Sequence, residues 1–266
     1  MFPKTLVVPL DGSSFAEQAV PVACALAERV NGGVLLLSAP YHGPFEPRTY
    51  LAEIAERCTG VPVETLASDV HLPADALLAS VEESDDRAVC MTSHGRGGLR
   101  WSMVGSTAEE VLRRSDRPVV LVGRHCRDDF LTQGKHLLAA VDGTRESETI
   151  APVAKEWSAR LGLVLTAACV VHPRDVVAAE QPETVLDPII DGFGGPDQVD
   201  ARLLFNAYVA GALADFAEDL PAAMIVASSH ARTGLARVAL GSVTMAVLHQ
   251  ATCPLLVGHS SSSSAA

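Results

Sequence analysis

One pattern occurs twice in this chain of 266 residues, as Ser-His-Gly-Arg-Gly-Gly-Leu from Ser93 and as Ser-His-Ala-Arg-Thr-Gly-Leu from Ser229. Each copy follows an apolar run and leads, at equal spacing, to a Gly-Ser pair, Gly105-Ser106 or Gly241-Ser242. A motif repeated together with its surroundings indicates a duplicated unit, and each half has the size of one domain. We therefore expect domains over 1–126 and 134–259, a linker near 126–134 and a disordered tail over 260–266.

Charge and composition exclude several classes of protein. With 20 Lys and Arg against 32 Asp and Glu, the formal charge is −12, which argues against a general nucleic-acid binder. No window reaches the roughly 18 apolar residues of a membrane span. The amino terminus lacks the pattern of a secretory signal, so we expect a cytoplasmic protein without membrane contact. The six cysteines occur singly, which predicts buried thiols in a reducing compartment and no metal site.

Apolar runs alternate with helical patterns in both halves, as in a parallel sheet covered on both faces. The sequence predicts an α/β fold of two tandem, open, parallel five-stranded sheets of Rossmann-like type. Strands are expected over 5–10, 33–39, 61–66, 88–92, 118–122, 136–141, 163–171, 223–228 and 254–257. Helices are expected over 16–30, 50–58, 73–83, 104–114, 147–161 and 243–250. The four prolines (Pro173, Pro182, Pro188 and Pro196) and the Gly192-Phe193-Gly194-Gly195 run predict a long loop over 173–200.

Residues with binding chemistry follow the first and fourth strands. Ligands of such sheets sit outside the carboxyl ends of strands where the strand order reverses. Asp11 ends the first strand, and the Thr92-Ser93-His94-Gly95 run ends the fourth. Glycines let backbone N–H groups approach a phosphate, and the helix that opens at Gly105-Ser106-Thr107 offers its positive dipole end. Arg96 and Arg100 add positive charge.

Each of these residues also has a purely structural interpretation. Gly105 alone is a turn and Ser106 an N-cap, Asp11 is a turn residue before a helix, and His94 is a packed side chain. No second titratable group lies near His94 in the sequence, so we predict no catalytic residue. P-loop, Gly-x-Gly-x-x-Gly and Gly-x-Ser-x-Gly motifs are all absent from the sequence.

These residues together resemble a tandem universal stress protein, a family with nucleotide-binding members and members that bind no ATP. The family pattern is Gly, two residues, Gly, nine residues, then Gly and Ser or Thr. On this chain the pattern falls on Thr92, Gly95 and Gly105-Ser106. The resemblance implies a fold of the adenine nucleotide alpha hydrolase kind that binds ATP, with or without magnesium. It also implies domains that pair through their fifth strands as a pseudo-two-fold pair, and a homodimer as a further assembly. The pocket residues that it implies in the first domain are Pro9, Leu10, Asp11, Ala39, Met91, Thr92, His94, Gly95, Arg96, Gly105, Ser106 and Thr107.

The second copy departs further from the family pattern. Ser228 and Ala231 replace both early glycines, which leaves Asp142, Val170, Gly241 and Ser242 as its candidate site. In the first copy only Thr92 departs, and a β-branched residue there is strained if the position needs a positive φ. We therefore expect the first domain to bind ATP better than the second.

Three functions follow from this pattern. The first is a nucleotide-dependent regulator of the stress response with its site mainly in the first domain. The second is a scaffold of the same fold that binds no nucleotide and acts through dimerisation or partner contacts. The third, a slow ATPase, has the least support, because no base or metal pair accompanies the motif.

Overall fold

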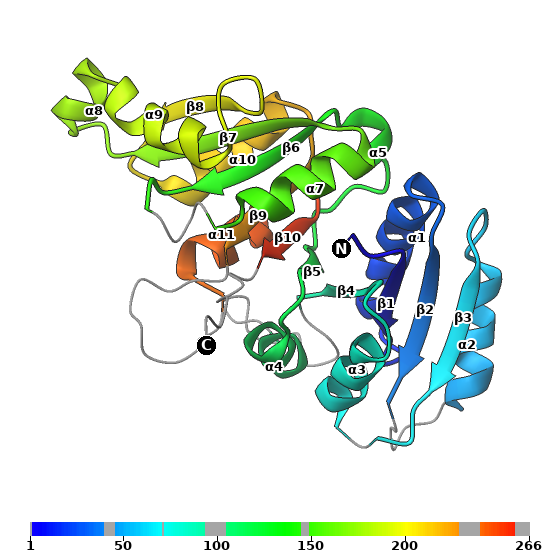
Figure 1. Ribbon diagram of the computed structural model, residues 1–266. Coiled ribbons are helices and arrows are strands. Elements are labelled where there is room, and N and C mark those ends of the chain that lie inside the picture. The colour runs from blue at the N-terminus through cyan, green and yellow to red at the C-terminus, as the bar shows by residue number, and fades with distance from the viewer. Residues whose placement is uncertain are drawn as a thin grey trace, which may run out of the picture. The chain divides into compact units, whose positions relative to one another are not determined.

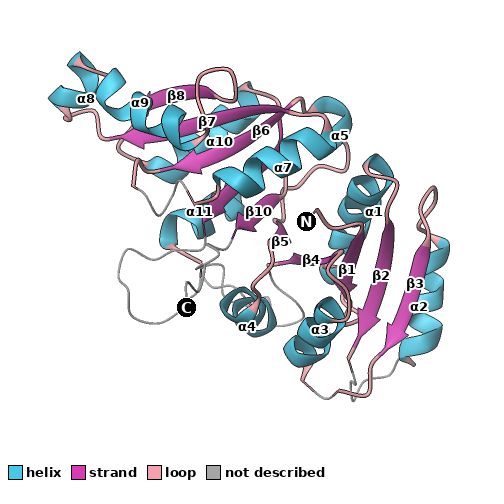
Figure 2. Cartoon of the chain, in the orientation of Figure 1, coloured by secondary structure: helices cyan, strands magenta, loops and turns pink. Residues whose placement is uncertain are grey.

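The computed structural model describes residues 2–39, 46–70, 72–93, 105–144, 149–228 and 240–258. The chain divides into two compact units, Met1–Arg124 and His125–Ala266. In both units helices flank a sheet of strands (Figure 2).

Unit 1 is an open parallel sheet in the order β3-β2-β1-β4-β5. Its helices cover both faces, α1 and α2 on one and α3 and α4 on the other (Figure 1). Its strands are β1 (Thr5–Pro9), β2 (Gly33–Ser38), β3 (Val63–Ala67), β4 (Arg87–Thr92) and β5 (Val119–Val122). Its helices are η1 (Ala16–Gln18), α1 (Ala19–Arg29), α2 (Pro47–Glu56), α3 (Pro73–Glu82) and α4 (Ser106–Arg114).

Unit 2 repeats this topology as a parallel sheet in the order β10-β9-β6-β7-β8. Its strands are β6 (His136–Val141), β7 (Val164–Val171), β8 (Asp200–Phe205), β9 (Ala222–Ser228) and β10 (Leu255–Gly258). Its helices are α5 (Phe130–Gln133), α7 (Ala151–Leu161), α8 (Val176–Glu180), α9 (Glu183–Gly192), α10 (Val209–Asp219) and α11 (Ser242–Gln250). The predicted fold class, two tandem parallel α/β domains, is confirmed.

The central strands form the cores, because both of their faces are covered. Val7 and Val8 in β1 and Leu137 and Leu138 in β6 have no measurable exposure. Continuous apolar strands of this kind are typical of parallel sheets under two helical layers. The carboxyl ends of the strands are consequently the places where polar side chains collect.

The predicted loop over 173–200 is wrong, since helices α8 and α9 occupy most of it. Asp175 caps α8 by accepting a hydrogen bond from the Ala178 amide at 3.1 Å, and Pro182 is the N-cap of α9. Pro188 lies inside α9. Prolines near helix starts are compatible with helix, so their number alone did not indicate a loop. Strand β8 and helix α10, for which we had predicted no element, complete the second sheet.

The segment in which we placed a linker, 126–134, is counted with unit 2. It contains α5, whose Phe130 is fully buried. A Cβ on Gly134 would lie 2.4 Å from the Ala223 Cα, so the chain is packed tightly against β9 here. Most of this segment is therefore part of a folded unit. The tail 260–266 lies outside the described residues.

Candidate functional site

The strand order of unit 1 reverses between β1 and β4. The chain leaves β1 for β2 on one side, whereas β4 pairs with the other side of β1 at Val7↔Val89. Extending the registers of β1 with β2 and β4 beyond the paired residues sets Ala39, Asp11 and Ser93 level with one another on three neighbouring strands. The structure thus brings the predicted Asp11 and Ala39 and the end of β4 together where ligands of this fold class bind.

Asp11 forms a turn with its own neighbours. Its Oδ1 accepts hydrogen bonds from the Ser13 amide at 2.9 Å and the Ser13 hydroxyl at 2.6 Å. Gly12 between them has φ +80°, a conformation that favours glycine. The Ser13 hydroxyl in turn accepts from the Ala16 amide at 3.1 Å, at the start of η1. The turn interpretation of Asp11 is correct, and it fixes the carboxylate at the sheet edge.

Tyr50 on α2 is a residue at this edge that sequence reasoning missed. Its hydroxyl donates to Glu17 Oε1 at 3.2 Å and also hydrogen-bonds the backbone at Gly12. Burial raises the pKa of Tyr50, and the nearby carboxylates of Glu17 and Asp11 raise it further. The helical pattern of α2 was visible in the sequence, but the long-range contact with the Asp11 turn was not.

The end of β4 is buried and has ordinary strand geometry. Met91, Thr92 and Ser93 are all at most 5% exposed. Thr92 pairs with Val122 and does not have a positive φ. A β-branched residue suits a strand, so the strain that we had considered at Thr92 is not present. Leu10, also a predicted site residue, is buried and donates its amide to the Leu37 carbonyl at 2.7 Å, and Pro9 ends β1.

Helix α4 begins at the same place. The Gly105 amide donates to the Ser93 carbonyl at 2.8 Å, so the two ends of segment 94–104 are joined. The predicted residues His94, Gly95 and Arg96 fall in that segment, outside the described residues. Gly105 is the N-cap, because its carbonyl accepts the first helical bond from Glu109 at 2.9 Å. The alternative, structural interpretation of Ser106 as the N-cap therefore does not hold.

No side chain caps α4 within the described part of the chain. The first amides of a helix have no partner in the helix and carry its positive dipole end, so this is a place where an anion is stabilised. Ser106 is exposed and Thr107 is half-buried, which leaves two hydroxyl groups beside these amides. The predicted pair Ser106 and Thr107 thus lies on the first turn of the helix, next to the neck formed by Ser93 and Gly105.

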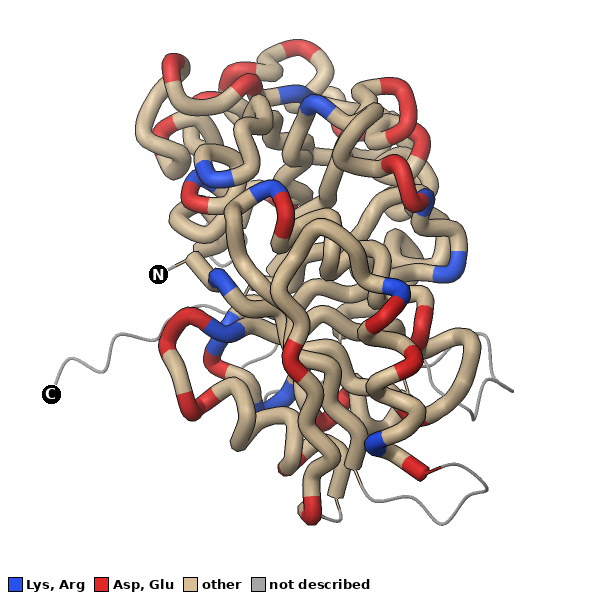
Figure 3. Tube along the Cα trace, turned by 90° about the vertical axis from the view of Figure 1, so that its right-hand side faces the viewer, with Lys and Arg blue, Asp and Glu red and all other residues tan. Residues whose placement is uncertain are grey.

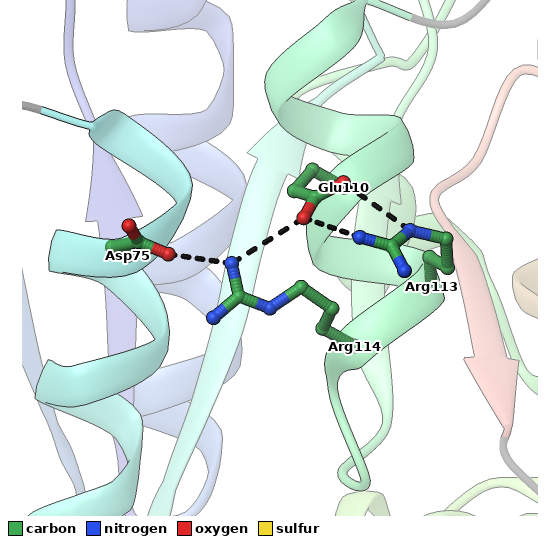
Figure 4. A network of polar contacts seen from close by, with 4 residues as sticks. All are labelled: Asp75, Glu110, Arg113 and Arg114. Atoms are coloured by element: carbon green, nitrogen blue, oxygen red, sulfur yellow. Dashed lines mark hydrogen bonds and ion pairs between the residues drawn. The ribbon is translucent and has the colours of Figure 1, made fainter.

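A polar network attaches α4 to α3 (Figure 4). Arg114 reaches from α4 to Asp75 on α3 and contacts Glu110 at 3.3 Å. Arg113 also binds Glu110, with its Nε 3.2 Å from Oε2. These hydrogen bonds, with that from Arg113 the largest, lower the pKa of Glu110. The network lies on the exposed surface and holds the helix that carries the candidate anion site.

The corresponding site in unit 2 has the same backbone. Asp142 Oδ1 accepts from the Thr144 amide at 3.0 Å and from its hydroxyl at 2.6 Å, and Gly143 has φ +73°. Gly241 is the N-cap of α11, with Ser242 as the first helical residue. The pairing Val141↔Cys169 sets Val170 level with Asp142, as Ala39 is with Asp11. Ala231 lies outside the described residues.

Cys169 lies beneath this second turn. Burial raises the pKa of its thiol to about 11, and the charge of Asp142 contributes to the shift. In unit 1 the corresponding residue is Ser38, whose hydroxyl approaches the Ala39 carbonyl at 3.5 Å. The two sites therefore share their backbone but differ in the side chains that line it.

Surface charge, candidate metal ligands and helix length are the remaining features of the molecule that bear on its function. Figure 3 shows Lys and Arg interspersed with Asp and Glu along the trace, in keeping with the net charge of −12. Over the described ranges, no three His, Cys, Asp or Glu side chains are grouped to hold a metal ion. No helix in those ranges is both long and apolar enough to cross a membrane.

The fold and the paired strand-end sites define a class of tandem α/β proteins with Rossmann-like sheets. The model of the universal stress protein family matches residues 46–123 and 198–259, one region in each unit. The chain belongs to the universal stress protein family.

Individual relatives agree with this assignment. Universal stress protein Rv2005c of Mycobacterium tuberculosis is 30% identical over 187 residues, which is 65% of this chain and 62% of that protein. The alignment thus spans less than two thirds of that relative. Universal stress protein Rv2623 of the same species is 29% identical over 215 residues, or 74% of this chain and 69% of that protein. A universal stress protein from Archaeoglobus fulgidus has the same fold, with a TM-score of 0.66 at 18% identity over 97% of this chain and 99% of that one.

Proposed function

We propose that unit 1 binds ATP and that the occupancy of this site regulates the protein in a stress response in the cytoplasm. The observation that carries the proposal is the start of α4. No side chain among the described residues caps its first turn, and the Gly105–Ser93 hydrogen bond of 2.8 Å fixes it beside the strand-order reversal. A helix terminus in that position suits the phosphates of a nucleotide.

The other residues at the edge suit the rest of the ligand. Asp11 is held rigidly by Ser13, so its carboxylate can accept a hydrogen bond from a ribose hydroxyl or an adenine amine without first being ordered. Ala39, level with Asp11, leaves room for a flat base because its side chain is a single methyl group. Magnesium would arrive with the phosphates, since it is usually held partly by them and by water.

A scaffold that binds no nucleotide is the competing function. It is supported by the turns themselves, because Asp11 and Asp142 make the same hydrogen bonds to their neighbours whether or not a ligand is present. On that view both aspartates are structural. Pairing of the two domains and a homodimer stay predictions in either case.

Calorimetric titration of the whole protein with ATP, with and without magnesium, separates the two functions. We expect one site per chain with a Kd below millimolar, and a nucleotide recovered by mass spectrometry from protein purified without added ligand. GTP is the matched control, since it carries the same phosphates on a different base. No heat with ATP at millimolar concentration would exclude the regulator and leave the scaffold.

A further inference from the structure

A continuous chain of hydrogen bonds connects the candidate ligand edge of unit 1 to α2. The chain begins at Asp11, whose Oδ1 accepts from the Ser13 hydroxyl at 2.6 Å. Ser13 is bonded in turn to η1, because its hydroxyl accepts from the Ala16 amide at 3.1 Å and its carbonyl accepts from the Glu17 amide at 3.3 Å. The position of the Asp11 carboxylate therefore depends on the position of η1.

Glu17 carries this chain from η1 to α2. One oxygen of its carboxylate accepts from the hydroxyl of Tyr50, on the first turn of α2, at 3.2 Å. The other oxygen accepts from the guanidinium of Arg57, the C-cap of α2, at 2.7 Å. The Arg57 side chain is 61% exposed, so its ion pair contributes little, whereas Tyr50 and Glu17 are half-buried. The bond between Glu17 and Tyr50 is therefore the sheltered link to α2, and a bond to a charged carboxylate is stronger than a neutral one.

Unit 2 has a different side chain at the position of Tyr50. When the strands of the two units are aligned by their registers, Leu186 of α9 precedes β8 at the spacing at which Tyr50 of α2 precedes β3. A leucine side chain has no hydrogen-bonding group, so Leu186 cannot make the bond that Tyr50 makes. Helix α9 is attached at its other end, where Lys155 Nζ of α7 donates to the Phe193 carbonyl at 3.2 Å. A link through a hydroxyl group at this position therefore belongs to unit 1.

We propose that Glu17 and Tyr50 are positioning residues of the ATP site, which couple nucleotide binding at Asp11 to the attachment of α2 to η1. This inference rests on the proposed binding of ATP in unit 1. A carboxylate binds its ligand most tightly when it is already ordered, because ordering it during binding costs free energy. The bonds that run from Tyr50 through Glu17 and Ser13 hold the Asp11 carboxylate in that ordered state.

Coupling of this kind acts in both directions. If the attachment of α2 raises the affinity for ATP, bound ATP must strengthen the attachment of α2 by the same factor. Helix α2 is then the element whose attachment reports the occupancy of the site, and any contact that loosens α2 lowers the affinity for the nucleotide. The chain of bonds thus provides a physical route from occupancy to regulation.

Calorimetric titration of the full-length protein with ATP tests the positioning role. Tyr50→Phe removes the hydroxyl and keeps the ring, and we expect the Kd for ATP to rise about fivefold, at the lower end of the couplings between linked sites. Tyr208→Phe is the matched control, because it removes a hydroxyl that is bonded to Gln250 at 2.6 Å in unit 2 and should leave the Kd unchanged. Glu17→Ala should also raise the Kd. Glu17→Gln keeps an oxygen that accepts from Tyr50 and should retain most of the affinity.

A double-mutant cycle distinguishes a positioning role from a direct contact with the nucleotide. If Tyr50 acts through Asp11, Tyr50→Phe should have no further effect on the Kd for ATP in an Asp11→Ala background. Losses of affinity that simply add would mean that Tyr50 acts independently of Asp11, and they would overturn the proposal.

Amide hydrogen exchange, followed by mass spectrometry, measures the coupling in the reverse direction. In wild type ATP should slow exchange in α2, and in Tyr50→Phe this protection should be lost. Without ATP, Asp11→Ala should already speed exchange in α2, whereas exchange in α3, on the other face of the sheet, should stay as in wild type. Unchanged exchange in α2 of Asp11→Ala would overturn the coupling whether or not ATP binds.

The titrations also separate this inference from the proposed function. No heat with wild type at millimolar ATP would exclude ATP binding and the positioning role together. Binding of ATP to wild type with an unchanged Kd in Tyr50→Phe would leave the proposed function standing and overturn the role of Tyr50 alone.

Discussion

Helices α4 and α11 begin in the same way but are attached to their neighbours by different chemistry. Their N-caps Gly105 and Gly241 have dihedrals of −60°, 147° and −57°, 152°. Yet α4 is held by ion pairs of Glu110 and Arg114, whereas α11 reaches α10 through a neutral bond of 2.6 Å from Gln250 to Tyr208. Duplication has thus preserved the backbone of the two sites and changed the side chains around them.

The same contrast holds at the ends of the first strands of the two units. Asp11 is half-buried beside Tyr50, while Asp142 is exposed above the Cys169 thiol. The turns that hold the two carboxylates are otherwise alike. A difference in ligand binding between the units would therefore have to come from side chains around these turns and from segments 94–104 and 229–239, not from the described backbone.

Phe130→Ala should give the largest difference in stability between unit 2 and unit 1. Phe130 is fully buried in unit 2, so its truncation should cost about 3–5 kcal/mol of unfolding free energy. Urea unfolding followed by the fluorescence of buried Trp157, in a Trp101→Phe background, reports on unit 2. Gln133→Ala, on the exposed side of the same helix, should leave the midpoint unchanged. Equal urea midpoints for Phe130→Ala and Gln133→Ala would mean that segment 126–134 is a linker and not part of unit 2.

Gly105→Val tests the asymmetry of nucleotide binding. The extended dihedrals of Gly105 are open to valine, so the fold should persist while the side chain covers the first amides of α4. We expect ATP affinity to fall at least about tenfold, or about 1.4 kcal/mol. Gly241→Val, at the same backbone position in unit 2, should leave the calorimetric titration unchanged. A larger loss of ATP affinity with Gly241→Val than with Gly105→Val would mean that the nucleotide site lies in unit 2 and not in unit 1.

Asp11→Ala should have a smaller effect on stability. It removes the acceptor for two hydrogen bonds in a partly exposed turn, which should cost about 1 kcal/mol. Asp142→Ala removes the same two bonds and should cost no more. ATP affinity, in contrast, should fall with Asp11→Ala alone. Equal losses of affinity in the two variants would contradict the asymmetry between the units.

The sequence predicted what depends on local pattern and on duplication. The buried strands, the turn at Asp11 and the family followed from apolar runs and motif spacing. The structural interpretation that made Ser106 the N-cap was off by one residue, because the cap is decided by backbone dihedrals that the Gly-Ser pair does not specify. The contact of Tyr50 with Glu17 was missed because it joins segments far apart in the chain. The loop predicted from the number of prolines was wrong at α9, because Pro188 is accommodated within the helix.

The smallest expected effect concerns the contacts that attach α4 and α11 to their neighbouring helices. The hydrogen bonds from the arginines lower the pKa of Glu110 in the folded protein. Its contribution should therefore be complete above the ordinary glutamate pKa of about 4.3 and disappear as the pH falls through the lowered folded value. Glu110→Gln should speed amide exchange in α4 slightly at neutral pH, and the difference from wild type should vanish in acid and at high salt. Gln250→Ala in α11 is the control, because its bond to Tyr208 joins an amide to a hydroxyl, and its effect on exchange should be the same in acid and at neutral pH. An acid-dependent effect in α11, or none in α4, would mean that the ion pairs of Figure 4 do not distinguish the two attachments.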